Sequence, residues 1–214
     1  LATLENHDAN KAFSRELINL HRGQGIDLYW RETLTVPSEH EYLEMSSLKT
    51  GGMFRMGVQM MQAFSEDQNI EKYSKLVNLL GLYFQLHGDY MNLCSDQFTE
   101  EKGFCEDLTE GKLSFLIIHA MRTDSFVCNQ LKNILRQRTK DRKIKEYAIS
   151  LLRGPKTFEY TLNALSDLEN DIRQEIDTLG GNAFLSKLLD KFCASIAKTL
   201  RHQDKVDKVD QQQQ

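Results

Sequence analysis

Proline is almost absent from this chain, and its absence restricts the possible folds more than any other feature of the sequence. The two prolines are Pro37 and Pro155, so the whole of residues 38–154 contains none. Because proline interrupts the interior of a helix, long helices can form throughout this stretch. Apolar residues recur with helical spacing, and no segment shows a convincing strand alternation. The sequence therefore predicts an all-α protein.

Capping and turn residues divide the chain into separate helices. Ser38 and Glu41 form a capping box that starts the second helix, which Gly51 and Gly52 later interrupt. The polar residues 95–112 are predicted to form a loop. We expect helices at about residues 10–33, 38–60, 70–94, 113–122, 124–138, 141–152, 157–179 and 182–200. They would form one domain over residues 1–200, followed by a disordered tail over residues 201–214.

Charge and cysteine content narrow the classes of function. The net charge of -4 gives no general attraction to nucleic acid or to an anionic membrane. An anion-binding site must therefore use locally placed lysines and arginines. The four cysteines are widely spaced, which favours reduced thiols over a zinc site or a disulfide framework.

The ends of the chain carry no recognisable address. No apolar run approaches the ~20 residues that span a membrane, and no secretory signal is found. We therefore expect a cytoplasmic protein. The first residue is Leu1 rather than methionine, so we also expect a fragment of a longer protein.

Polar residues form a stripe on the otherwise apolar helix at residues 70–94. Gln85, Gly88, Asp89 and Asn92 are spaced i, i+3, i+4 and i+7, which places them on one face. Burying such groups costs free energy unless they are hydrogen-bonded. The stripe indicates either a solvent-facing side of a surface helix or a functional polar site.

The loop that follows this helix is rich in charge of both signs. Its apolar anchors are Phe104 and Leu108, and its charged residues are Glu100, Glu101, Lys102, Glu106, Asp107, Glu110 and Lys112. Carboxylates bind magnesium through oxygen, and lysines neutralise phosphate oxygens. The cluster is therefore compatible with a magnesium–diphosphate site, and equally with a solvated loop.

Two further polar features lie in the first and second helices. Gln24 and Asp27 stand i, i+3 within the first. The Lys49-Thr50-Gly51-Gly52 segment interrupts the second, and each glycine costs ~1 kcal/mol relative to alanine. Close helix packing explains these glycines better than ligand contact does. The segment lacks the residue order of a P-loop.

Other known site patterns are absent from the sequence. The histidines show no HExxH or similar metal spacing, and GxSxG and GxGxxG do not occur. Met53, Met56, Met60 and Met61 have helical spacing, which favours a core position over a cofactor site.

Five blocks of sequence, taken together, resemble one enzyme family. They are LHRGQGIDLYWRE (20–32), KTGGMFRM (49–56), LLGLYFQLHGDYMNL (79–93), EKGFCEDLTEGK (101–112) and FEYT (158–161). In this order and at these separations they resemble eukaryotic, and especially fungal, geranylgeranyl diphosphate synthases. The resemblance extends from about Leu4 to Leu200.

The resemblance implies an isoprenoid synthase-like helical bundle whose N-terminal helices are missing from this chain. Family members join isopentenyl diphosphate to an allylic diphosphate with Mg²⁺ as cofactor, and they usually form dimers. The magnesium ions and lysines stabilise the charge that develops on the departing diphosphate.

The family's site residues match positions of this chain. The resemblance implies catalytic roles for Lys49, Thr50, Gln85 and Lys112, and diphosphate binding by Lys49, Lys102 and Lys112. It implies metal binding by Asp89 and Asn92. Gln24 and Asp27 match a helix pair that lines the cavity, with Asp27 supporting the metal ligands.

The sequence departs from the family pattern at the metal motifs. The second motif of the family begins Asp-Asp-Tyr-x-Asn, whereas this chain has Gly88 before Asp89. Glycine cannot bind a metal through a side chain, so the principal ligand of that motif is lost. No DDxxD motif occurs in the chain. A smaller departure is Leu116, where the family commonly has proline.

Three functions follow from these observations. The first is a prenyltransferase whose activity is impaired in this chain. The second is a non-catalytic helical subunit that pairs with a complete synthase and modulates it. The third, a class I terpene cyclase, shares the fold and metal chemistry, but the five blocks resemble synthases more closely. The sequence does not predict the length of the prenyl chain that is formed.

Overall fold

The regular structure of the chain is entirely helical. The computed structural model describes residues 5–66, 69–94 and 103–212, and no strand occurs within these ranges. The predicted all-α fold is therefore confirmed. The helices are α1 (His7–Thr33), α2 (Glu39–Ser46), the π-helix η2 (Ser47–Gly51), α3 (Gly52–Gln62), α4 (Ile70–Cys94), α6 (Glu106–Glu110), α7 (Phe115–Thr123), α8 (Ser125–Gln137), α9 (Arg142–Arg153), α10 (Thr157–Thr178) and α11 (Ala183–Gln212).

Most predicted helix ends agree with the structure to within a few residues. Helix α4 spans the predicted range, and the capping box of Ser38 and Glu41 at the start of α2 is present. Two predictions differ from the structure. The expected loop contains the short helix α6, and α11 continues to Gln212 although the sequence predicts disorder beyond Leu200.

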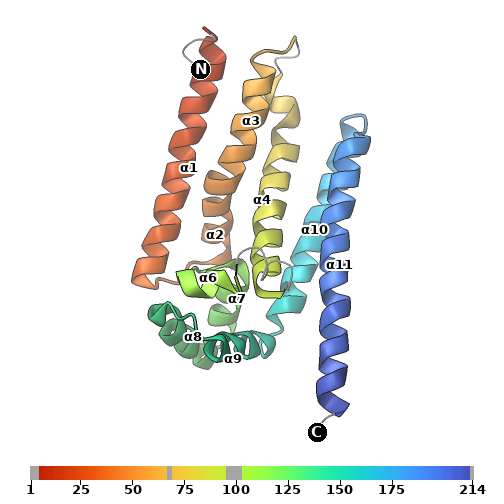
Figure 1. Ribbon diagram of the computed structural model, residues 1–214. Coiled ribbons are helices and arrows are strands. Elements are labelled where there is room, and N and C mark those ends of the chain that lie inside the picture. Colours follow the sequence, from red (N-terminus) through yellow and green to blue (C-terminus); the bar gives the residue numbers. More distant parts are fainter. Residues whose placement is uncertain (1–4, 67–68, 95–102, 213–214) are drawn as a thin grey trace.

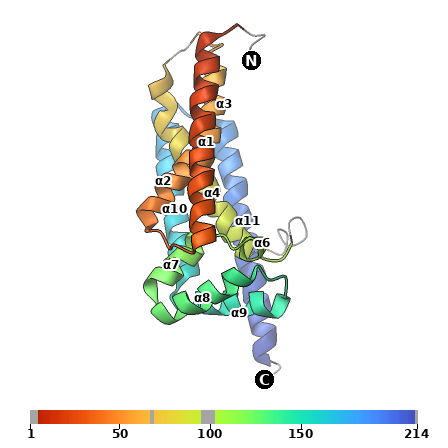
Figure 2. The ribbon, with the colours of Figure 1, turned by 90° about the vertical axis from the view of Figure 1, so that its left-hand side faces the viewer.

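The long helices stand side by side, and the short ones gather at one end of them (Figure 1). Helix α3 contacts α1 and α4, α4 contacts α10, and α10 contacts α11. Helices α6 to α9 lie where α1 and α4 end, and the last turns of α11 extend past α8 and α9 (Figure 2). The junction of α2 and η2 lies near this same end, between α1 and α4.

The core is centred on α7. Its four consecutive residues Phe115, Leu116, Ile117 and Ile118 are all buried, as in a helix that is covered on every side. Tyr42, Tyr83 and Tyr90 add large buried side chains from α2 and α4. Full burial of one such apolar side chain contributes about 1.5–3 kcal/mol. This core fixes the ends of α2, α4 and α7 relative to one another.

Two glycines bring three helices into close contact around η2. A Cβ atom at Gly23 of α1 would lie 2.6 Å from the backbone nitrogen of Lys49, and one at Gly81 of α4 would lie 2.7 Å from the Cα of Gly51. Only glycine allows such close approach. Gly51 and Gly52 are themselves buried, as the packing explanation predicts, and η2 lies tightly between α1 and α4.

The methionines of α3 are not in the core, contrary to the prediction. The buried residues of α3 are Gly52, Gln59 and Gln62, whereas Met53 and Met61 are exposed. Close packing of α3 against α1 and α4 uses its glycine and glutamine side, which leaves Met56 and Met60 only half-buried. None of the helices in the described ranges combines the length and apolar character required to cross a bilayer.

Candidate functional site

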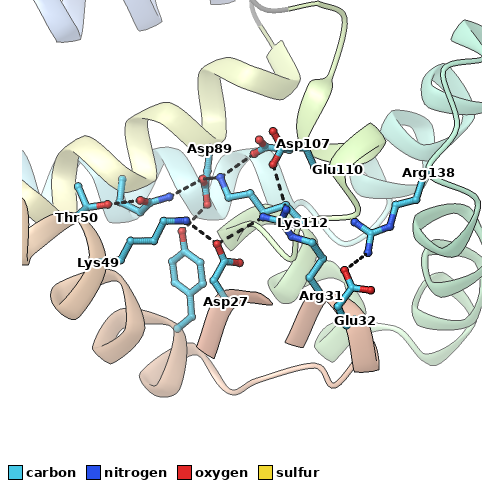
Figure 3. Close-up of polar contacts among 12 residues, drawn as sticks. Asp27, Arg31, Glu32, Lys49, Thr50, Asp89, Asp107, Glu110, Lys112 and Arg138 are labelled. Carbon is cyan, nitrogen blue, oxygen red and sulfur yellow. Dashed lines mark hydrogen bonds and ion pairs between the residues drawn. The ribbon is translucent and has the colours of Figure 1, made fainter. Parts of the chain in front are cut away.

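A group of charged and polar side chains lies where α1, η2 and α4 meet the segment that contains α6 (Figure 3). We call it the polar network. Its members are Asp27, Arg31, Lys49, Thr50, Gln85, Asp89, Asp107, Glu110 and Lys112. Six of these were predicted as site residues from the sequence.

Asp89 is the most completely buried carboxylate of the network. It is 0% exposed, and four donors surround it. Its Oδ1 accepts from Lys112 Nζ at 2.7 Å and from Gln85 Nε2 at 2.9 Å. Its Oδ2 accepts from the Phe115 backbone N–H at 2.8 Å and from the Tyr42 hydroxyl. A buried charge requires this degree of satisfaction. The solvent-facing interpretation of the polar stripe is therefore wrong.

Lys112 connects Asp89 to the short helix α6. Its Nζ lies 2.7 Å from Asp89 Oδ1 and 3.1 Å from Asp107 Oδ2, and its side chain is 14% exposed. Burial lowers the pKa of Lys112, but the two carboxylates outweigh this effect and raise that pKa above its ordinary value. The lysine therefore stays charged and holds two carboxylates together.

Asp107 has an unusual protonation equilibrium. Burial raises the pKa of this carboxyl to about 6, although the charge of Lys112 acts in the opposite direction. The neighbouring Asp89 carboxylate also raises this pKa, because a second negative charge nearby disfavours the charged form of Asp107. Asp107 is therefore protonated more readily than an ordinary aspartate.

Lys49 forms a separate and more open part of the network. Its Nζ lies 2.6 Å from Asp27 Oδ2, and its side chain is 26% exposed. Arg31, one helical turn after Asp27, lies 3.6 Å from the same oxygen and 3.4 Å from Glu110. The Asp27 carboxylate is therefore shared by two cations.

Thr50 and Gln85 join the two parts. The Thr50 hydroxyl donates to Gln85 Oε1 at 2.5 Å, and Gln85 in turn donates to Asp89. Adjacent residues of η2 therefore reach different carboxylates: Lys49 contacts Asp27, and Thr50 acts on Asp89 through Gln85.

The family of this chain follows from comparison with known proteins. A sequence model of the family described as Polyprenyl synthetase matches residues 1–152. The chain belongs to the polyprenyl synthetase family. The predicted resemblance to prenyl diphosphate synthases is therefore confirmed.

Individual members of the polyprenyl synthetase family are similar over most of the chain. A geranylgeranyl pyrophosphate synthase of Mucor circinelloides f. lusitanicus is 50% identical over 177 residues, which cover 83% of this chain and 57% of the relative. One of Hypoxylon pulicicidum is 47% identical over 195 residues, covering 89% and 50%. A protein named terpene synthase from Matsumurasca onukii is 46% identical over 186 residues, covering 87% and 60%. The chain thus spans about half to three fifths of these relatives.

Two of the described residues predicted for the site lie outside the network. The side-chain oxygen of Asn92 accepts from the Asp107 backbone N–H at 3.1 Å, so Asn92 supports the start of α6. Gln24 is half-buried on α1, one turn before Asp27. Lys102 lies outside the described residues.

The structure adds residues to which the sequence analysis gave no role in the site. Arg31 follows Asp27 at the i+4 spacing of a helical ion pair, a signal that was available in the sequence. Tyr42 binds Asp89 across 47 positions of the chain, and no local pattern indicates such a contact. Asp107 was one of several acids in the charged loop, and only its burial distinguishes it.

The residues predicted to bind a metal in this polyprenyl synthetase chain do not fit a magnesium ion. Gly88 has no side-chain ligand, the oxygens of Asp89 already accept from four donors, and the oxygen of Asn92 accepts from the Asp107 backbone N–H. Within the described ranges no group of three or more histidine, cysteine or acidic residues could hold a metal. In this structure, Asp89 contacts Lys112 and Asn92 contacts the first turn of α6.

Proposed function

We propose that the chain forms part of a prenyltransferase that condenses isopentenyl diphosphate with an allylic diphosphate, as geranylgeranyl diphosphate synthases do. Membership of the polyprenyl synthetase family supports this function, as do the relatives named geranylgeranyl pyrophosphate synthase. The observation that carries the proposal is the convergence of Lys49, Gln85, Asp89 and Lys112 on one polar network. Residues scattered over separate surfaces would not support it.

In this reaction the allylic carbon–oxygen bond breaks and the diphosphate departs with the electron pair. The alkene of isopentenyl diphosphate attacks the resulting cation, a carbon–carbon bond forms, and a proton is lost. We assign Lys49 to the departing diphosphate, because its side chain is the more exposed of the two lysines and contacts a single carboxylate. A fixed ammonium group stabilises the negative charge that develops on the leaving oxygen.

Lys112 has a different role in this proposal. Two of its three donors are directed at Asp89 and Asp107, which leaves one for a ligand. We infer that Lys112 mainly holds the two carboxylates in place and adds positive charge beside the diphosphate. Thr50 and Gln85 keep Asp89 oriented from the opposite side.

The charge of the network limits how tightly it binds a diphosphate. Three cations, Arg31, Lys49 and Lys112, face the four carboxylates of Asp27, Asp89, Asp107 and Glu110. A diphosphate must compete with these carboxylates for the same donors. We therefore expect weak binding of diphosphate to this chain. Magnesium is the cofactor implied by the family, but the ligands predicted for it in this chain do not fit it.

The test is incubation of the purified chain with magnesium, isopentenyl diphosphate and farnesyl diphosphate, followed by analysis of products by mass spectrometry. We expect geranylgeranyl diphosphate to form far more slowly than with a complete homologue. Lys49→Met should abolish this product, whereas Lys143→Met, a change at an exposed lysine of α9, should leave it unchanged. A cyclic hydrocarbon as product would instead favour a terpene cyclase. Product formation that is insensitive to Lys49→Met would contradict the assignment of the site.

An assembly with a second copy, or with a complete synthase, is part of the same proposal. It rests on the dimers that the family resemblance implies. Size-exclusion chromatography with light scattering, on the chain alone and mixed with a complete homologue, tests it. A monomer under both conditions would contradict it.

A further inference from the structure

Lys49 and Thr50 belong to a π-helix, and this is a rare conformation. Segments of this kind occur mostly as single turns within α-helices, frequently at functional sites. Helix η2 inserts between α2 and α3, so the chain contains one residue more than a continuous α-helix would need. Each residue turns an α-helix by about 100°, so the extra residue rotates everything that follows by this amount.

Residues before η2 and within it both contact the polar network. Tyr42, before the π-helix, reaches Asp89. Lys49 and Thr50, within it, reach Asp27 and Gln85. Relaxation of η2 to an α-helix would rotate the residues that follow the extra one relative to Tyr42. The observed set of contacts therefore belongs to the π conformation of η2.

Arg55 contacts η2 from the following turn of α3. Its Nη2 donates to the Ser47 carbonyl at 3.0 Å, and its Nη1 approaches the Ser47 hydroxyl at 3.4 Å. A Cβ atom at Gly51 would lie 3.0 Å from the same Nη1, so this glycine leaves room for the guanidinium. Arg55 thus binds the first residue of the π-helix and lies against its last.

The guanidinium is also fixed from outside α3. Arg55 Nε donates to Glu16 Oε2 at 3.0 Å, and Nη1 donates to Asn78 Oδ1 at 2.8 Å. Glu16 is buried on α1, whereas Asn78 belongs to α4. Burial raises the pKa of Glu16, whereas the hydrogen bond from Asn19 and the charge of Arg55 lower it. The lowering effects are larger together, so the pKa of Glu16 lies below that of an ordinary glutamate. One arginine therefore connects η2 to both helices that flank it.

We propose that Arg55 is a positioning residue for the diphosphate site: it holds η2 in the π conformation that presents Lys49 and Thr50. Among the described contacts, Arg55 makes none with a residue of the polar network. Its effect on ligand binding passes through the backbone of residues 47–51. The effect on binding rests on the proposed function, whereas the effect on η2 does not.

The test compares Arg55→Met and Arg55→Lys with Arg15→Met. Arg15 donates to the same carboxylate, Glu16, at 3.1 Å but does not contact Ser47, so it is a matched control. Amide hydrogen exchange of residues 47–52 measures the stability of η2, and calorimetry with inorganic pyrophosphate measures the site. Urea unfolding establishes that each variant is folded at the temperature used.

We expect Arg55→Met to accelerate exchange in residues 47–52 and to weaken pyrophosphate binding by roughly tenfold, the effect of losing a charged hydrogen bond. Arg55→Lys should give an intermediate result, because one ammonium group cannot reach Glu16, Asn78 and Ser47 together. In Arg15→Met, the exchange rate of residues 47–52 and the affinity for pyrophosphate should both stay within about twofold of the parent values. This change is well under the effect of a lost charged hydrogen bond.

Two results would overturn the proposal. One is an amide exchange rate of residues 47–52 in Arg55→Lys that equals the rate in the parent; this variant is the informative one if Arg55→Met does not fold. The other is an equal change of this exchange rate in Arg15→Met and Arg55→Lys. If amide exchange of residues 47–52 accelerates as expected but the parent chain binds no pyrophosphate, the proposed function is contradicted. The role of Arg55 in stabilising η2 is then still supported.

Discussion

The two lysines of the polar network lie in different surroundings. Lys112 bridges Asp89 and Asp107 beneath the core helix α7, whereas Lys49 contacts Asp27 at a more exposed position between α1 and α4. In the buried part, nearly every donor and acceptor has a protein partner. In the open part, the lysine has donors to spare. The comparison teaches that similar charges can maintain the structure in one place and remain available to a ligand in another.

The difference has a physical origin. An ion buried without partners costs several kcal/mol, so a buried pair is stable only when its remaining lone pairs are also hydrogen-bonded. Asp89 meets this requirement with four donors. An ion near the surface is solvated and needs fewer partners. We therefore expect substitutions in the buried part to affect stability and those in the open part to affect binding.

Asp89→Asn should have the largest effect on stability. The asparagine would direct its NH₂ group at donors, either Lys112 and Gln85 or Tyr42 and the Phe115 amide. We expect a loss of about 3 kcal/mol in the free energy of unfolding, measured with urea. Glu110→Gln, which alters a half-exposed partner of Arg31, should change the free energy of unfolding by less than about 1 kcal/mol. Equal losses of stability in the two variants would contradict the distinction between the buried and the open part of the network.

Lys49→Met should act mainly on ligand binding. Asp27 retains Arg31 as a partner, so the fold keeps one cation beside this carboxylate. We expect a loss of roughly tenfold in affinity for inorganic pyrophosphate, equivalent to about 1.4 kcal/mol. Calorimetry of Lys49→Met, with Lys143→Met as the control, measures this affinity. An unchanged affinity would show that Lys49 does not contact the diphosphate.

Asp107→Asn should change the pH dependence of stability. The pKa of Asp107 is raised to about 6 in the fold, above its ordinary value near 4, so the folded state binds more protons between these pH values. The contribution of Asp107 to stability is therefore present below pH 4 and is lost as the pH rises to about 6.

Urea unfolding of the parent and of Asp107→Asn, at several pH values from 4 to 7, measures this contribution. The parent should lose stability relative to the variant as the pH rises through this range, with little further change above it. A constant difference between the two proteins would show that the pKa of Asp107 is not raised.

Gly88→Asp should have the smallest effect on stability. A Cβ atom at Gly88 meets nothing within 4 Å, and aspartate is slightly favoured over glycine in a helix, so we expect a change below about 1 kcal/mol. The new carboxylate should raise the magnesium-dependent affinity for pyrophosphate, measured by calorimetry with and without magnesium. Gly57→Asp, at a second open glycine on α3, is the control. Absence of a gain in Gly88→Asp, or an equal gain in Gly57→Asp, would contradict the match of Gly88 to the first aspartate of the family's second metal motif.

Several features of the fold were predictable because their signals are local. The apolar periodicity of residues 70–94 gives the range of α4, and the spacing of Ser38 and Glu41 gives the start of α2. The grouping of Lys49, Gln85, Asp89 and Lys112 followed from family resemblance rather than from local pattern. Their spacing alone left a solvent-facing stripe as an equal or better explanation.

Other features depend on contacts between distant residues. The burial that separates Lys112 from Lys49 is set by the packing of α7, and neither lysine's neighbours in sequence indicate it. The π-helix η2 packs against Gly23 and Gly81 and is contacted by Arg55, and these three residues lie on three different helices. The start of α6 is supported by Asn92, for which the family resemblance implied a metal-binding role.

Nuclear magnetic resonance of the lysine side-chain ammonium groups tests the contrast between the two lysines most directly. In a titration with inorganic pyrophosphate, we expect the Lys49 resonance to shift with the bound fraction, while the Lys112 resonance stays close to its original position. A larger shift of Lys112 than of Lys49 would contradict the account, because the buried lysine would then be the one that meets the ligand.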